Sequence, residues 1–180
     1  MTIRFIRAVA ACAALATVAT AHAQNAASNH VYAQVGAGQN TQTYSIGFSR
    51  PFQWRQDFYG GVFKALWEVQ IGRWKGSYPE DRWYTQAGLT PTLRYDWTAD
   101  GPLFLEAGIG ANVVTPHFAH GHHSRFATRF QFGDHLGVGM YLGPAHADEI
   151  ALRIEHYSNG GYKQPNPGVN FVQLRYSHGF

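Results

Sequence analysis

The sequence has one cysteine, few charged residues and no long apolar run. Cys12 lies in an N-terminal segment that we expect to be removed, so disulfides and cysteine chemistry are excluded from the mature protein. Charged residues make up 14% of the chain, and taking Arg4 and Arg7 from the 14 basic residues leaves 12 against 11 acidic ones. That balance gives no footprint for nucleic acid. Because no remaining apolar run could span a bilayer as a helix, a membrane-spanning form would have to use strands.

The first 23 residues have the pattern of a secretory signal peptide. Arg4 and Arg7 precede the apolar run 8–20, and Ala21-His22-Ala23 has the small-x-small form of a cleavage site. The apolar run, at about 13 residues, is too short for a transmembrane helix. We predict a signal peptide over 1–23, cleavage after Ala23, and a single domain over 24–180.

Period-two alternation of apolar and polar residues recurs through the rest of the chain, whereas helical periodicity is hard to find. In the clearest case Trp83, Leu89 and Trp97 share one face, and the aromatic residues at its two ends match the girdles of a bilayer-spanning strand. Eight segments alternate in this way: 31–37, 44–48, 63–71, 83–97, 103–113, 130–140, 148–158 and 169–180. Roughly 20 residues per strand and connection suit strands tilted across a membrane, and single-chain bacterial barrels have an even strand number. We therefore predict an all-β fold, an eight-stranded antiparallel transmembrane β-barrel of the bacterial outer membrane.

The last segment supports this prediction. Val172, Leu174, Tyr176 and Phe180 alternate with polar residues or glycine, and the chain stops on an aromatic. This pattern resembles the closing strand of bacterial outer-membrane barrels. An edge strand of a soluble sandwich is the alternative.

The connections between segments differ in length and polarity. Turn-like residues at 100–102 and 143–145 suit the periplasmic side, which leaves both termini in the periplasm. Four longer, more polar stretches suit the outer side: 50–57, 73–82, 115–127 and 159–168. Proline is usually excluded from a paired strand interior, so Pro91 predicts a β-bulge.

Several charged residues have the parity of the barrel interior: Lys64, Glu68, Arg94, Glu106, Arg153 and Glu155. An eight-stranded barrel is just filled by its side chains, and buried charges there must pair. We interpret this set as a structural ion-pair network. The inward parity of Glu155 makes it an interior residue rather than a partner of His156.

The segment 148–158 carries the most informative polar pair. Ile150, Leu152 and Ile154 lie on its apolar face, and alternation continues that face through His156 and Ser158. At that spacing the two Cα atoms lie roughly 6–7 Å apart, which allows a histidine base to approach a serine nucleophile. An ester hydrolase with this pair on its lipid-facing side would act on a lipid. By spacing alone, an interfacial turn that anchors the strand end is an equally good interpretation.

The sequence around this pair resembles a known family. His156-Tyr157-Ser158-Asn159-Gly160-Gly161, followed by Lys163-Gln164-Pro165-Asn166-Pro167-Gly168, is similar to the signature of the lipid A 3-O-deacylases, the PagL-type enzymes. The resemblance implies an eight-stranded outer-membrane barrel that hydrolyses the ester at the 3-position of lipid A. It also implies His156 as general base and Ser158 as nucleophile.

Other site residues follow from the same resemblance. Asn166 matches a family asparagine that stabilises the oxyanion or positions the loop, and Asn159 and Gly161 are weaker candidates for that role. Where the family's triad glutamate is expected, fourteen residues after the histidine, this chain has Asn170. An amide oxygen can fix the imidazole tautomer, as in Cys-His-Asn hydrolases, but it supplies no negative charge. We predict a working, slower Ser-His-Asn arrangement, with a shifted register or lost activity as alternatives.

A second histidine group, His117, His120, His122 and His123, lies in the stretch 115–127. Its irregular spacing and lack of nearby carboxylates disfavour a metal site, and contact with lipopolysaccharide phosphates, helped by Arg125 and Arg129, is at least as good an interpretation. We expect no metal and no organic cofactor.

The leading hypothesis is an outer-membrane esterase acting on lipid A or lipopolysaccharide. Its rivals are a non-catalytic structural or adhesion barrel, and a different lipid enzyme such as a phospholipase or palmitoyl transferase barrel. The sequence leaves open whether two barrels form a homodimer.

Overall fold

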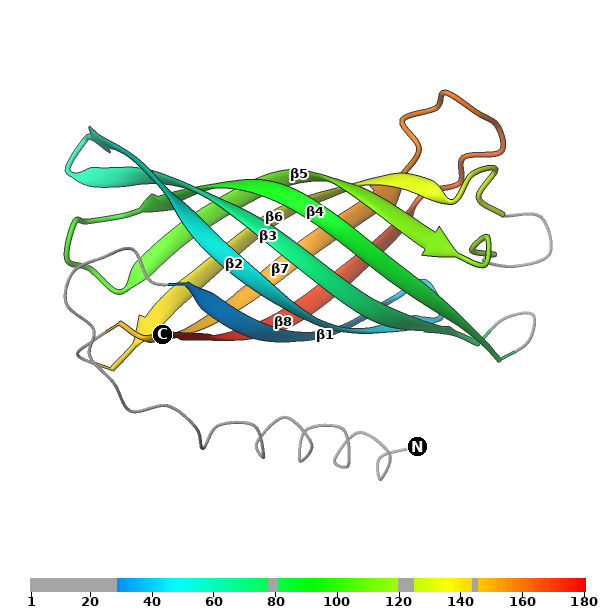
Figure 1. Ribbon diagram of the computed structural model, residues 1–180, viewed down its shortest axis with the longest axis horizontal. Coiled ribbons are helices and arrows are strands. Elements are labelled where there is room, and N and C mark those ends of the chain that lie inside the picture. The colour runs from blue at the N-terminus through cyan, green and yellow to red at the C-terminus, as the bar shows by residue number, and fades with distance from the viewer. Residues whose placement is uncertain (1–28, 78–80, 120–124, 144–145) are drawn as a thin grey trace.

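The computed structural model describes residues 29–77, 81–119, 125–143 and 146–180, which form a closed antiparallel barrel (Figure 1). Its strands are β1 (His30–Gly38), β2 (Thr41–Phe58), β3 (Gly61–Gly76), β4 (Arg82–Asp96), β5 (Leu103–Thr115), β6 (Phe130–Leu142), β7 (Asp148–Ser158) and β8 (Val169–Gly179). Each strand pairs with its neighbours in sequence, and β8 closes the barrel against β1. The predicted fold class is confirmed. Within the described residues, no helix has the length and apolarity needed to cross a membrane.

The barrel has an apolar outside and a polar inside, which is the reverse of a soluble protein. Outward side chains such as Ile46, Ile109 and Leu136 are 60–65% exposed. Inward glutamates, arginines and glutamines are buried. Alternation along each strand produces both surfaces at once, because successive side chains point to opposite faces.

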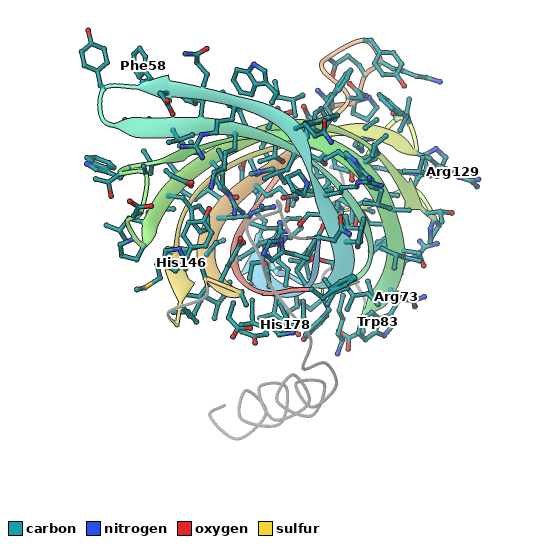
Figure 2. The ribbon with its side chains drawn as sticks, turned by 60° about the vertical axis from the view of Figure 1, so that its left-hand side comes forward. Phe58, Arg73, Trp83, Arg129, His146 and His178 are labelled. Atoms are coloured by element: carbon teal, nitrogen blue, oxygen red, sulfur yellow. The ribbon has the colours of Figure 1, made fainter. Side chains whose placement is uncertain are left out.

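Two predictions about the connections are wrong. Residues 50–57 belong to β2, and residues 73–76 belong to β3. The turn that follows Phe58 lies at the end of the barrel opposite the segment that holds Arg129 (Figure 2), and the Tyr95 hydroxyl donates to the Phe58 carbonyl (3.0 Å). The hairpin therefore extends on the side predicted to be periplasmic. In the β2 half of this hairpin the side chains of residues 52–58 are exposed on both faces, so the alternation that identifies a strand is lost there although the backbone pairing continues.

The expected bulge at Pro91 is also wrong. The β4–β5 ladder runs from Leu89 to Thr92 without a change of register and skips only the two residues between them. Proline lacks the N–H that the ladder would use there. The register shift among the described strands lies instead in β2–β3, between Pro51 and Arg55.

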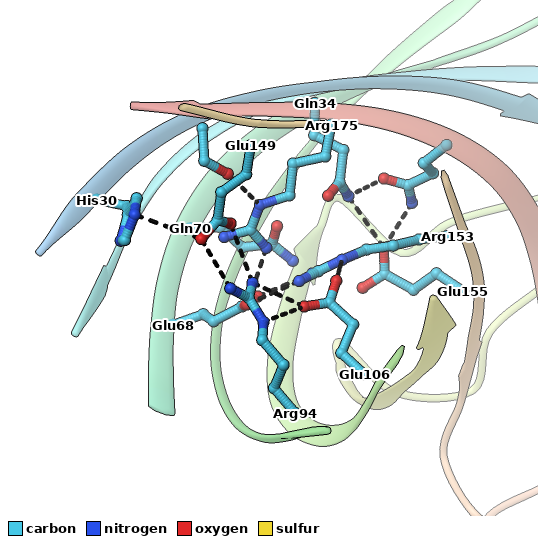
Figure 3. Close-up of polar contacts among 12 residues, drawn as sticks. His30, Gln34, Glu68, Gln70, Arg94, Glu106, Glu149, Arg153, Glu155 and Arg175 are labelled. Atoms are coloured by element: carbon cyan, nitrogen blue, oxygen red, sulfur yellow. Dashed lines mark hydrogen bonds and ion pairs between the residues drawn. The ribbon is translucent and has the colours of Figure 1, made fainter. Parts of the chain in front are cut away.

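The interior charges pair as predicted (Figure 3). Glu106 accepts from Arg153 Nε (2.6 Å) and Arg94 Nη2 (3.0 Å), and Glu68 accepts from Arg153 Nη2 and Arg175 Nη1 (both 2.8 Å). Two further pairs extend this network toward the end of the barrel where β7 begins, Arg94–Glu149 and Lys64–Asp96. Glu155 is buried as predicted, but hydroxyl and amide groups of Tyr157, Gln34 and Gln173 bond it instead of an arginine.

Candidate active site

The end of β7 presents His156 and Ser158 on the outer face of the barrel. Both side chains are half-buried, while the alternate residues Glu155 and Tyr157 are buried inside the barrel. Tyr157 packs edge-on against Trp74, with ring centroids 4.7 Å apart, in an aromatic cluster that fills this end of the barrel. Packing on the inner face therefore fixes the strand that carries the outer pair.

Asn170 of β8 is the hydrogen-bond partner of His156. The two residues are register partners, and His156 Nδ1 lies 2.8 Å from Asn170 Oδ1. An amide oxygen can only accept, so this bond assigns the proton to Nδ1 and leaves Nε2 able to act as a base. The backbone N–H of Asn170 in turn donates to Gln39 Oε1 (3.3 Å) in the β1–β2 turn.

Gly168 makes room for the imidazole. It has a φ of +66°, and a Cβ at this position would lie 2.8 Å from His156 Cε1. Any larger residue would have to displace the ring. Glycine is required here for both its backbone conformation and its size.

The hydroxyl of Ser158 lies on the same face as the imidazole. Its Oγ accepts a 3.4 Å hydrogen bond from the Gly160 N–H. Across the described residues, no direct hydrogen bond joins Ser158 to His156. Catalytic hydrogen bonds are often long before substrate binds and tighten in the complex.

The three loop residues singled out in the sequence come together after β7. Asn159 is buried; its Oδ1 accepts from Gly161 N–H (2.9 Å), and its Nδ2 donates to the Lys163 carbonyl (2.7 Å). Its backbone N–H donates to Asn166 Oδ1 (3.0 Å). The polar groups of Asn159 therefore hold the loop in shape.

Sequence reasoning assigned no role to three residues beside the site: Gly168, which ends the family signature, Gln39 and Asp134. Asp134 is the register partner of His156 on β6, opposite Asn170 on β8. Its position between Phe132 and Leu136 on an outward face was the available signal, because a carboxylate there interrupts an otherwise apolar face. Gln39 had no such signal, since its contact depends on how distant segments meet.

A group of cationic side chains lies in the loops at the same end of the barrel. Arg125 and Arg129 precede β6, and the Ala127 N–H donates to the Pro165 carbonyl (3.1 Å), which ties this segment to the loop after β7. Burial and the nearby Arg125, Arg129 and Lys163 charges lower the pKa of His117. The other three histidines of the predicted group lie outside the described residues, and the described ones contain no group of three metal-ligating side chains.

The chain is similar to known proteins in both sequence and fold. Over residues 40–179 the sequence matches the family described as lipid A 3-O-deacylase (PagL). It is 35% identical over 166 residues to a lipid A deacylase PagL of Bordetella bronchiseptica, covering 90% of this chain and 89% of that protein. A lipid A deacylase PagL of Pseudomonas aeruginosa is 30% identical over 171 residues, with coverages of 88% and 91%. A crystal structure of the outer membrane enzyme PagL has a TM-score of 0.72 and 28% identity, covering 83% of this chain and 98% of that one.

Proposed function

The chain belongs to the lipid A 3-O-deacylase family, and on that basis we propose that it removes the 3-O-linked hydroxyacyl chain of lipid A. The observation that carries the proposal is the pair His156 and Ser158 on the outer face of β7, with the imidazole held by Asn170. The outer face around this serine is apolar, so a water-soluble substrate would not bind beside it. A lipid whose acyl chains lie along the barrel wall would.

Ser158 is the nucleophile and His156 the general base of the proposed reaction. Nε2 of His156 takes the Oγ proton while Oγ bonds to the ester carbonyl carbon, giving a tetrahedral oxyanion. The oxyanion collapses, the bond to the sugar oxygen breaks, and that oxygen receives the proton from the imidazolium. Water, activated by the same imidazole, then releases the hydroxy fatty acid and restores the serine. The reaction needs neither metal nor cofactor.

Asn170 is assigned the role of holding the imidazole tautomer, since its Oδ1 accepts from Nδ1. The Gly160 N–H, already directed at Ser158 Oγ, and the Nδ2 group of Asn166 are the oxyanion donors we favour. Asn159 and Gly161 bond one another within the loop, which supports a positioning role for both.

The proposed location is the outer membrane, with the exposed aliphatic belt in the hydrocarbon layer and the end that holds Ser158 in the outer leaflet. We propose that residues 1–23 are a signal peptide cleaved after Ala23. Because one chain supplies all the proposed catalytic groups, a homodimer is not needed for activity. The cations at Arg125, Arg129 and Lys163 would face the phosphates of lipopolysaccharide.

Mass spectrometry of lipid A tests the function directly. Cells that express the wild-type chain should lose one 3-hydroxyacyl group from lipid A, and cells that express Ser158→Ala should not. Heat-modifiable mobility on a denaturing gel would establish that both barrels are folded. Equal loss in both samples would overturn the role of Ser158, and no loss with a folded wild-type barrel would overturn the proposed substrate.

A further inference from the structure

Asp134 is a carboxylate on the outward face of β6, where its neighbours along the strand are Phe132 and Leu136. Both of those side chains are exposed to the surroundings of the barrel. An acidic side chain on such a face destabilises a membrane barrel, by more the deeper it lies. Oδ1 of Asp134 is buried and has no hydrogen-bond partner among the described residues. Local structure therefore does not explain this carboxylate.

Its position does. Asp134 and Asn170 are both register partners of His156, one on each side of β7. Cross-strand partners on one face have Cβ atoms roughly 4.5–5.5 Å apart, so the carboxylate flanks the imidazole. Of the other groups near His156, Glu155 and His135 point into the barrel, and Ser158, Gly168 and Asn170 carry no charge.

The same barrel contains a second carboxylate–imidazole pair of this kind. Asp148 and His178 are register partners at the other end of β7, and His178 Nδ1 lies 2.7 Å from Asp148 Oδ1. Cross-strand register in this barrel can therefore place a carboxylate beside an imidazole. At His156 the Nδ1 position is already taken by Asn170, so Asp134 is left to act through its charge.

We propose that Asp134 is a positioning residue that supplies the negative charge Asn170 lacks, stabilising the imidazolium of His156 during acyl transfer. The inference rests on the proposed function. Positive charge develops on the ring when Ser158 gives up its proton, and it disappears when the sugar oxygen receives that proton. A fixed carboxylate beside the ring favours the charged stage over the resting one, which lowers the barrier without strengthening substrate binding. One glutamate would both fix the tautomer and supply the charge. Here Asn170 on β8 fixes the tautomer and Asp134 on β6 supplies the charge.

Substitutions at position 134 separate this role from a structural one. With purified full-length protein in lipid A–detergent micelles, Asp134→Asn and Asp134→Leu should each lower kcat roughly tenfold to a hundredfold with KM unchanged. Asp134→Glu should keep most of the activity. Asp148→Asn, the matched control beside His178, should leave kcat unchanged. A purely structural role predicts the opposite for Asp134→Leu, because a leucine suits an apolar face, and wild-type kcat in that variant would overturn the proposal.

A double-mutant cycle with Asn170→Glu gives a second test. A glutamate at position 170 would bring charge to the other flank, so Asp134→Asn should then cost no more than about threefold. An equal loss on both backgrounds would overturn the proposal. The wild-type and Ser158→Ala proteins are measured alongside: if folded wild-type protein releases no fatty acid, the proposed function fails and the role of Asp134 fails with it. Release by the wild type with no effect of Asp134→Leu overturns the role of Asp134 alone.

Discussion

Replacing Gly168 with alanine should disable the site while leaving the barrel folded. The added Cβ would lie 2.8 Å from His156 Cε1 and 3.4 Å from Nε2, whereas carbon atoms normally pack about 3.5–4.0 Å apart. The ring must therefore move by roughly 0.7–1.2 Å, away from its bond with Asn170 or away from Ser158. A misplacement of about 1 Å in a catalytic group can cost on the order of a hundredfold in rate.

The alanine also meets a backbone penalty, since a left-handed conformation costs a non-glycine residue about 1–2 kcal/mol. Gly60→Ala is the matched control: Gly60 has a φ of +83° in the β2–β3 turn and open space around its missing Cβ. Both variants should lose similar stability in urea unfolding, and only Gly168→Ala should lose kcat in a fatty-acid release assay. Equal activity in the two variants would refute the steric argument.

Three further predictions concern other parts of the molecule. Asn170→Ala removes the acceptor of Nδ1 and should lower kcat roughly tenfold to a hundredfold, measured by fatty-acid release; unchanged kcat would mean that another group holds the tautomer. Glu106→Ala leaves Arg94 and Arg153 incompletely paired inside the barrel and should cost about 3–5 kcal/mol of unfolding free energy. A urea midpoint equal to that of the wild type would contradict a structural role for this network. Arg129→Glu with Lys163→Glu should raise KM and weaken the salt dependence of KM with kcat unchanged, and a KM that stays constant would exclude these cations from substrate binding.

The sequence predicts the fold well because a barrel wall is encoded locally. Alternation within each strand decides which side chains meet lipid and which fill the interior, so the inward position of Glu155 and the outward position of Ser158 follow from parity alone. The prediction failed at 50–57, because the β2 side chains from residue 52 onward are exposed on both faces and the alternation disappears. It failed at Pro91 because a missing N–H can interrupt a ladder without shifting its register.

The site is encoded less locally. His156 and Ser158 lie two residues apart, so one strand brings them together, and the spacing to Asn170 was expected only through the family resemblance. The parts that were missed depend on contacts between strands: the register that sets Asp134 beside His156, and the loop path that brings Gly168 against the ring. No property of a single segment specifies those contacts.

The inner face of β7 bears on how molecules reach the proposed site. Tyr157 and Glu155 are buried inside the barrel, with Tyr157 part of the aromatic cluster at this end, whereas His156 lies on the outer wall. With the proposed function, a substrate reaches His156 sideways, by two-dimensional diffusion within the leaflet, and its effective concentration is then a surface density rather than a bulk molarity. An inhibitor meets the same requirement: its partitioning into the bilayer enters its measured potency as much as its fit to Ser158 does. Two compounds with equal contacts to the serine and different acyl tails would therefore rank by their tails.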